Sequence, residues 1–498
     1  MAPPDFDILI IGAGLSGIGA AYHLQTKQPG KRYAILEARA DLGGTWDLFK
    51  YPGIRCDSDA FTFGYDFKPW DSDQAIADGP SIKAYIAETA RENGIDRHIR
   101  FHHQVLDANW SSSDRQWVVR VERTDTAEEI VLRASWLFAA AGYYRYDKGF
   151  TPTFEGAQRF HGPIVHPQHW PQDLDYRDKR VVVIGSGATA VTLVPALATQ
   201  AAHVTLLQRT PSYVLPVPAA DPVARRLRPW LGDRLTHAVT RRVNIARQRW
   251  VYALFQRYPA RARKFIRSIN VRMLPVDFPV DVHFNPPYAP WEQRLCAVPE
   301  GDLFKTIGRG DASIVTDHIA AFTETGIQLK SGVHLPADII VTATGLNLQP
   351  LGGLKLMIDG TTVRLADTVA FKGMMLSGVP NMAFAIGYTS SSWTLKVGLL
   401  CEHFCRLLAH METHGFEVCT PVADPAMATQ PLLNFGAGYV QRSLGELPRQ
   451  GNAFPWLTSW DYASDAKLLR KGAVADKHLQ FTPRRTGTAQ VATAQGVV

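Results

Sequence analysis

Glycines at fixed spacing, followed by one acid, form the first candidate binding site of the chain. Gly12-x-Gly14-x-x-Gly17, with Ser16 inside it, follows the apolar stretch DFDILII and opens an amphipathic pattern. The first glycine allows a tight turn, the second lets backbone approach a pyrophosphate, and the third lets a helix pack closely. Glu37 ends the next strand-like stretch, twenty residues after Gly17, where it is placed to accept ribose hydroxyl groups.

A second copy of this pattern lies in the middle of the chain. It contains Gly185, Ser186, Gly187, Thr189 and Ala190. The next strand-like stretch ends in Arg209 and Thr210 instead of an acid, and an arginine at this position suits a 2′-phosphate. This favours NADPH over NADH, although an ordinary surface arginine is the alternative.

Two dinucleotide sites, one with an acid and one with an arginine, suggest FAD that is reduced by NADPH. Disulfide reductases share this arrangement, but they need closely spaced redox cysteines, and this sequence has no Cys-x-x-Cys pair. Molecular oxygen is therefore the expected electron acceptor.

A linker between the two glycine motifs narrows the chemistry. Phe160, Gly162, His166, Trp170 and Pro171 stand at the spacing F-x-G-x-x-x-H-x-x-x-W-P. This spacing, together with GGTWDLFKYPGIRCD over residues 43–57, resembles the signatures of the type I Baeyer–Villiger monooxygenases. The sequence is most similar to the ethionamide-activating mycobacterial subgroup of that family.

The resemblance implies a flavin enzyme that uses NADPH and O₂ to convert ketones to esters or lactones through a C4a-peroxyflavin. Oxidation of sulfides or thioamides is a companion activity in that interpretation. Two alternatives stay open: a nitrogen- or sulfur-oxygenating flavin monooxygenase without ketone activity, and a non-catalytic flavoprotein that binds a partner. The Trp170-Pro171 ending disfavours the first alternative.

The family motif also implies catalytic residues. It matches Arg294, whose permanent positive charge would stabilise an anion, and Asp57, which would orient the guanidinium. Gln293 replaces a lysine that many relatives use for the 2′-phosphate, so more of that task falls on Arg209. Further flavin contacts are implied at Gly44, Thr45, Trp46 and Val105, although Trp46 could equally be a core residue.

In the family, the linker lies where the chain leaves the FAD domain for the NADPH domain, so we interpret it as a hinge that couples the two domains. His166 could act as a general base. We favour a structural role, because a linker imidazole more often orders backbone than transfers protons.

The length of 498 residues exceeds what one hydrophobic core usually serves, so at least two domains are expected. We predict an α/β protein with two doubly wound, Rossmann-like domains. The FAD domain would comprise residues 1–150 and 346–480, and the NADPH domain 151–345 with a helical insertion over 213–290. A disordered tail would follow over 481–498.

The five cysteines are odd in number and indicate neither a disulfide framework nor a zinc site. Neither a secretory signal nor a membrane span is evident in the sequence, so a cytoplasmic location is expected. No metal is predicted.

Positive charge is concentrated in the insertion. Residues 224–273 hold fourteen Lys or Arg and one acid, so the rest of the chain carries a net −6 against +7 overall. Leu235, Val239, Val243, Ala246, Trp250 and Leu254 recur at helical spacing. The stripe is expected to pack on the NADPH domain, and the alternative is peripheral contact with anionic membrane. Nucleic acid is not expected as a partner, because no binding module accompanies the charge.

Overall fold

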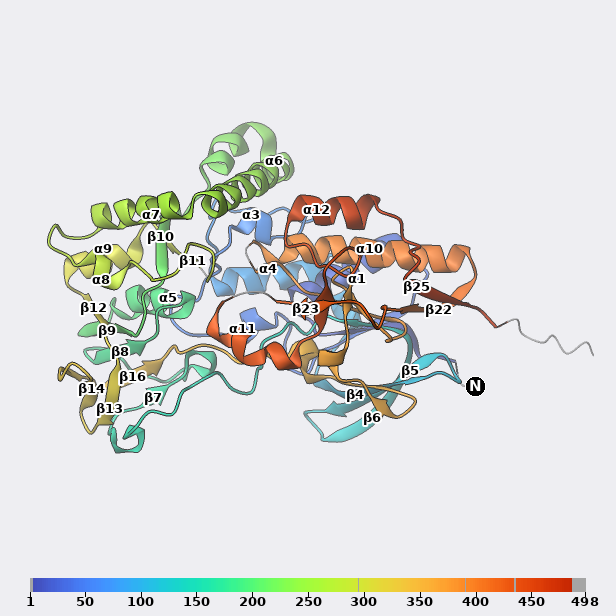
Figure 1. The fold of residues 1–498 in the computed structure, drawn as a ribbon, viewed down its shortest axis with the longest axis horizontal. Helices are drawn as coiled ribbons and strands as arrows, with labels where there is room; N and C mark the ends of the chain where they lie inside the picture. The colour runs from blue at the N-terminus through green and yellow to red at the C-terminus, as the bar shows by residue number, and fades with distance from the viewer. Residues whose placement is uncertain (1–2, 294, 390, 434–435, 486–498) are drawn as a thin grey trace, which may run out of the picture.

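The computed structural model describes residues 3–293, 295–389, 391–433 and 436–485. Two β-sheets with their own helices lie side by side (Figure 1). The sheet on the right of this view is built from both ends of the chain, and the sheet on the left from its middle.

The first sheet has the order β18-β17-β4-β5-β6-β1-β2-β3, and β21 also pairs with β6. Its strands are β1 (Phe6–Ile11), β2 (Tyr33–Leu36), β3 (Ile99–Arg100), β4 (His103–Ser111), β5 (Gln116–Arg123), β6 (Glu128–Ala139), β17 (Lys355–Ile358), β18 (Thr361–Thr362) and β21 (Met382–Phe384). β1 runs parallel to β2 and β6, whereas β4, β5 and β6 are antiparallel neighbours. The sheet is therefore mixed around a parallel centre. The last four residues of β1 are buried, as expected for a strand that is covered on both faces.

The helices that accompany this sheet are α1 (Leu15–Lys27), α2 (Thr45–Leu48), α3 (Ala60–Phe63), α4 (Gly79–Glu92), α10 (Trp393–Thr413), α11 (Gly438–Ser443) and α12 (Tyr462–Ala466). α1, α4 and α10 share one apolar core with β1. Short ladders complete this part: β19 (Ala370–Phe371) with β20 (Met375–Leu376), β22 (Phe416–Pro421) with β25 (Leu479–Pro483), and β23 (Thr429–Pro431) with β24 (Arg449–Gly451).

The second sheet, of order β12-β9-β8-β16-β7, is parallel throughout. Its strands are β7 (Ile164–Val165), β8 (Arg180–Ile184), β9 (His203–Gln208), β12 (Ala312–Thr316) and β16 (Ile339–Thr342). α5 (Ala188–Leu197) and α9 (Asp302–Arg309) pack against each other beside it, and β13 (Ile319–Thr323), β14 (Gly326–Leu329) and β15 (His334–Pro336) form a small antiparallel sheet. Two Rossmann-like α/β units are thus confirmed.

The insertion begins with a strand, so the expectation of helices from residue 213 was wrong at its start. β10 (Tyr213–Val217) pairs in parallel with β11 (Leu295–Pro299). Between them lie α6 (Pro222–Arg257), which is broken at Gly232, α7 (Pro259–Met273) and α8 (Val280–His283). α6 packs on α3, which is one of the helices that accompany the first sheet. Its predicted apolar stripe does not pack on the second sheet.

The expected tail also differs at its start. Phe481–Pro483 form the end of β25, because their backbone pairs with β22. Residues 486–498 lie outside the described part of the chain. Within the described ranges, every helix is too short or too polar to cross a bilayer.

Candidate functional site

A cavity of about 1610 Å³ lies between the two sheets and is lined by both glycine motifs. The predicted site residues on its wall are Gly12, Gly14, Ser16, Glu37, Gly44, Thr45, Trp46, Asp57, Val105, Gly185, Ser186, Gly187, Thr189, Arg209 and Thr210. Gly17 and Ala190 instead pack behind the loops and are buried. The volume exceeds the roughly 300–1,000 Å³ of a pocket for one drug-sized ligand. The cavity is therefore large enough to take more than one such ligand.

The first loop joins β1 to α1, and Gly14 is the N-cap of that helix. A Cβ on Gly17 would stand 1.9 Å from the carbonyl oxygen of Gly12, so only glycine fits there. Glu37 follows β2, and its carboxylate accepts hydrogen bonds from the backbone N–H groups of Ala13 (2.8 Å) and Arg39 (3.1 Å). Burial raises the pKa of Glu37, and these two donors act against the rise. The arrangement places backbone N–H groups and one carboxylate together at the start of a helix, which suits a nucleotide diphosphate with its ribose.

The second loop repeats this geometry between β8 and α5, with Gly187 as the N-cap. Arg209 and Thr210 follow β9, and Arg209 is exposed at the cavity wall. Ser212 donates a hydrogen bond to the Ser186 hydroxyl at 2.9 Å, which ties the loop to the segment after β9. A cation at this position can meet a phosphate group.

The segment from residue 43 to residue 57 runs from the helices of the first sheet to the core around the second sheet. Tyr51 is buried in the apolar core around the second sheet, and Arg55 forms an ion pair with Asp302 at 2.5 Å. Trp46 is partly buried against the Phe63 ring and also lines the cavity, so it combines the two roles that the sequence left open. This segment carries Asp57 to the junction between the domains.

The chain passes twice between the parts of the molecule built on the two sheets, once near Arg145 and once near Gly345. The linker fingerprint lies beside both places and does not line the cavity. His166 caps the 3₁₀ turn η3 (Pro167–His169): its Nδ1 accepts from the Gln168 backbone N–H at 3.2 Å, and its Nε2 lies 3.0 Å from the Gly345 carbonyl oxygen. Burial lowers the pKa of this imidazole. The Gln168 side chain donates to the carbonyl of Arg145 at 2.7 Å. The fingerprint therefore fixes the outgoing crossing at Arg145 and the returning crossing at Gly345, which favours the structural role for His166.

The remaining fingerprint residues build the turn itself. Phe160 is buried in an apolar cluster, and a Cβ on Gly162 would stand 2.1 Å from the Asp338 carbonyl oxygen. Trp170 packs on Tyr176 at 6.4 Å between ring centroids, and Pro171 follows it. These contacts explain why the stretch requires aromatic residues and a glycine.

Arg294 lies outside the described residues, so its predicted role is a hypothesis from the sequence alone. Gln293 and Cys296, on either side of it, line the cavity.

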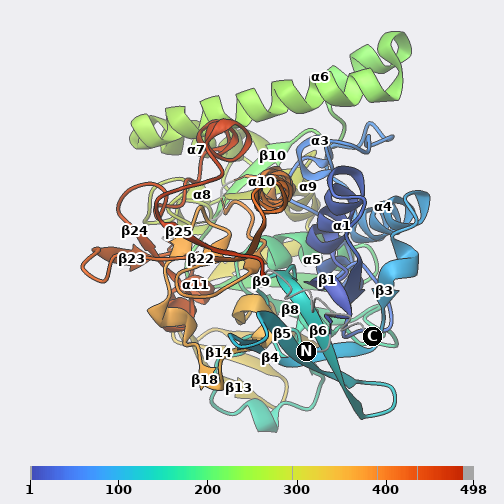
Figure 2. The same cartoon turned by 90° about the vertical axis from the view of Figure 1, so that its right-hand side faces the viewer.

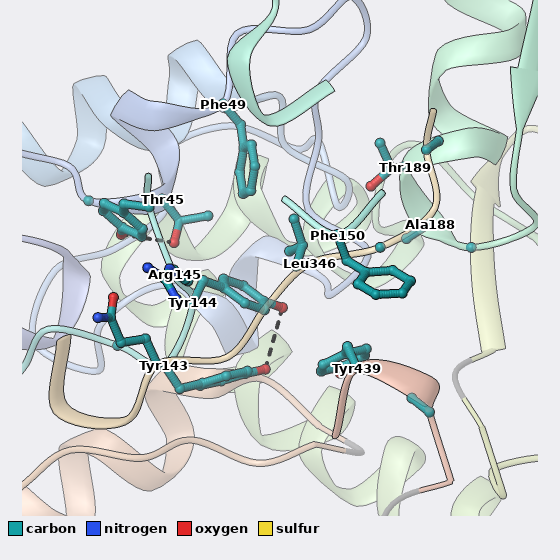
Figure 3. A pocket seen from close by; sticks show the side chains of 18 of the residues that line it. Thr45, Phe49, Tyr143, Tyr144, Arg145, Phe150, Ala188, Thr189, Leu346 and Tyr439 are labelled. Carbon is teal, nitrogen blue, oxygen red and sulfur yellow. Dashed lines mark hydrogen bonds between the residues drawn. The ribbon is translucent and has the colours of Figure 1, made fainter. Parts of the chain in front are cut away.

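Sequence reasoning missed an aromatic wall of this cavity. Phe49, Tyr143, Tyr144, Phe150 and Tyr439 surround one part of it, and Figure 3 shows the Tyr143 and Tyr144 rings side by side with their hydroxyl groups 3.4 Å apart. Two adjacent tyrosines shortly after the end of a buried strand, separated from it by Ala140, Ala141 and Gly142, were a signal that could have been used. The wall makes part of the cavity suitable for an apolar ligand.

Comparison with known proteins gives a family match. The flavin-binding monooxygenase-like family matches residues 54–237, and an NAD(P)-binding Rossmann-like domain matches residues 10–70. The chain is 52% identical to the FAD-containing monooxygenase EthA of Mycobacterium tuberculosis, over 96% of this chain and 98% of the relative. It is 49% identical to the putative FAD-containing monooxygenase MymA of the same species, over 96% and 97%.

Solved structures give the same fold. A steroid monooxygenase bound to NADP superposes with a TM-score of 0.74 at 23% identity, covering 96% of this chain and all of that one. At this identity the likeness shows the fold alone.

Proposed function

The chain belongs to the family of FAD-containing monooxygenases that includes EthA, and we propose that it oxidises ketones to esters or lactones with NADPH and O₂. Sulfides and thioamides are proposed as further substrates. The single observation that supports this best is the one cavity lined by both nucleotide loops, because electrons must pass from one cofactor to the other within it.

The described residues fit these two cofactors. Gly12, Gly14 and the N-terminus of α1 would hold the FAD pyrophosphate, and Glu37 would accept the ribose hydroxyl groups. Gly185, Gly187 and the N-terminus of α5 would hold the NADPH pyrophosphate. FAD, when bound, supplies the redox chemistry with O₂.

Arg294 and Asp57 are the two charged residues that we propose for the reaction centre. The Arg294 guanidinium cannot lose its proton, so it would stabilise negative charge that develops during oxygen transfer. Asp57, on the cavity wall at the domain junction, would orient that guanidinium. We propose that the substrate occupies the part of the cavity with the aromatic wall, where Tyr143, Tyr144 and Tyr439 exclude water.

Incubation with NADPH, O₂ and a panel of ketones and sulfides tests the proposal through the products formed. Esters or lactones support it, whereas sulfoxides alone would favour the oxygenase without ketone activity. We further propose a cytoplasmic protein that contacts membrane through its basic insertion.

A further inference from the structure

α6 presents an unusual distribution of side chains. After the break at Gly232, its inner face carries the buried polar residues Thr236, His237, Thr240, Arg241 and Asn244. The opposite face carries the apolar stripe Leu235, Val239, Val243, Ala246, Trp250 and Leu254. An amphipathic surface helix normally buries its apolar face, whereas α6 buries its polar face and exposes its apolar face.

Specific hydrogen bonds fix this orientation of α6. Arg241 donates to the carbonyls of Phe61 (2.8 Å), Thr62 (3.1 Å) and Gly64 (2.8 Å) at the end of α3. Asn244 donates to Asp59 at 3.0 Å. Rotation of α6 to bury its stripe would break all of these bonds and leave buried polar groups unpaired, which is costly.

The outer face is open along its length. Trp250 is 66% exposed, Leu235 is 59% exposed, and Val243 and Leu254 are also exposed. In Figures 1 and 2, α6 runs across the top of the molecule with no other element above it. Apart from Val239, which is partly buried, the described chain therefore leaves the apolar stripe open on one side of the molecule.

Arginines flank this stripe. By helical geometry Arg242 and Arg249 lie along one edge and Arg247 along the other, and Arg257 lies at its end. Arg249 forms an ion pair with Asp461, and Arg247 lies 3.9 Å from the Asp221 carboxylate, whereas Arg242 is exposed and has no acidic partner among the described residues. The surface thus combines apolar side chains at its centre with positive charge at its edges.

We propose that the outer face of α6 binds the surface of an anionic phospholipid bilayer. Trp250, Leu235 and Val243 enter the interfacial region, while the flanking arginines contact lipid phosphates. A second copy of this chain fits poorly, because two such faces, each within a segment of net charge +13, repel each other. Nucleic acid would leave the apolar centre without a partner. The inference assigns the membrane contact proposed above to one face of α6, and it does not depend on the proposed oxidation.

Binding at this face would bring the bilayer close to the cavity. The Gln248 side chain, on the inner side of α6, accepts a hydrogen bond from Ser391 at 3.1 Å, and Ser391 lines the cavity. Only the thickness of one helix, roughly 10 Å, separates the outer face from this wall. Apolar substrates dissolved in the bilayer would then lie near the site of oxidation.

Co-sedimentation of the FAD-containing protein with vesicles tests this inference. Vesicles of phosphatidylglycerol and phosphatidylcholine should bind it at low salt, vesicles of phosphatidylcholine alone should bind it at least about tenfold more weakly, and salt should reduce the difference. Two variants, Arg242→Gln/Arg247→Gln/Arg257→Gln and Val243→Ser/Trp250→Ser, should each lower the partition coefficient by about tenfold or more.

A matched control removes three exposed charges elsewhere, Arg97→Gln/Lys330→Gln/Arg364→Gln, and should bind vesicles like the wild type. Flavin content and melting temperature verify that each variant is folded. Equal wild-type binding to both vesicle types, no binding to either, or equal loss in the control would overturn the inference. Self-association in solution that Trp250→Ser abolishes would identify the face as a contact between copies instead.

Discussion

The backbone N–H of Ala13 donates a 2.8 Å hydrogen bond to Glu37, so the acid after β2 holds the glycine loop that opens α1. A second backbone donor, Arg39, fixes the other carboxylate oxygen at 3.1 Å. Glu37 therefore has two tasks, because the same side chain positions the phosphate loop and faces the cavity where a ribose is expected.

Replacement of Glu37 with alanine should weaken FAD binding by about tenfold to a hundredfold, because hydrogen bonds to a charged group contribute about 1.5–3 kcal/mol. Flavin fluorescence after gel filtration measures the fraction of FAD released. Glu324→Gln, at an exposed position, is the control and should retain FAD. Full FAD retention by Glu37→Ala would remove the ribose role.

Arg209→Ala should raise the KM for NADPH by about tenfold or more and leave the KM for NADH within about twofold, because only NADPH carries the 2′-phosphate. Steady-state oxidation of both nucleotides measures the two constants. An equal change for the two nucleotides would show that Arg209 does not contact the 2′-phosphate, and the preference would then have another source.

Neighbouring arginines of α6 should differ sharply in their effect on stability. Arg241→Met should lower the free energy of unfolding by about 3 kcal/mol or more, because three carbonyls at the end of α3 lose their donor. Arg242→Met, one residue away and exposed, should change it by less than about 0.5 kcal/mol. Urea unfolding and limited proteolysis compare the two variants, and similar losses would contradict the anchoring role.

His237 should make the protein sensitive to acid. Its Nδ1 accepts from the Trp70 backbone N–H at 3.1 Å, and burial, with the nearby Arg241 charge, lowers its pKa to about 4. An unfolded histidine has a pKa of about 6.5, so the unfolded state binds more protons between these values. Stability is fully present above about pH 6.5 and falls by at most about 1.4 kcal/mol per pH unit down to about pH 4.

The His237→Gln variant should therefore lose less melting temperature between pH 7 and pH 5 than the wild type. His161→Gln, at an exposed position, is the control and should follow the wild type. The same pH slope in all three proteins would show that His237 does not titrate in this range.

Motifs with steric causes could be predicted from the sequence. The glycine loops could be recognised because only glycine fits at positions such as Gly17, whatever the rest of the chain does, and in the structure Gly12, Gly14 and Glu37 line the cavity. The linker at Phe160–Pro171 could be located for the same reason. Its partners, the carbonyls of Arg145 and Gly345, depend on tertiary packing and could not be identified from spacing.

The orientation of α6 was wrong because spacing alone does not reveal which face of a helix is buried. The stripe at Leu235, Val243 and Trp250 indicated a helix correctly. The hydrogen bonds of Arg241 and Asn244 to α3 and its N-cap residue Asp59 determine which side faces inward. Arg241, one of the fourteen basic residues of the insertion, is buried and so does not add to its surface charge.

Product analysis of the wild type beside Arg294→Ala tests the central claim most directly. With NADPH, O₂ and a cyclic ketone, the wild type should form the lactone, detected by mass spectrometry with one oxygen atom from ¹⁸O₂. Arg294→Ala should keep FAD bound and oxidise NADPH, yet form at least about a hundredfold less lactone, because the developing negative charge loses its cation. Arg309→Ala, at an exposed position, should behave like the wild type. Absence of any lactone from the wild type across the ketone panel, or undiminished lactone from Arg294→Ala, would contradict the account.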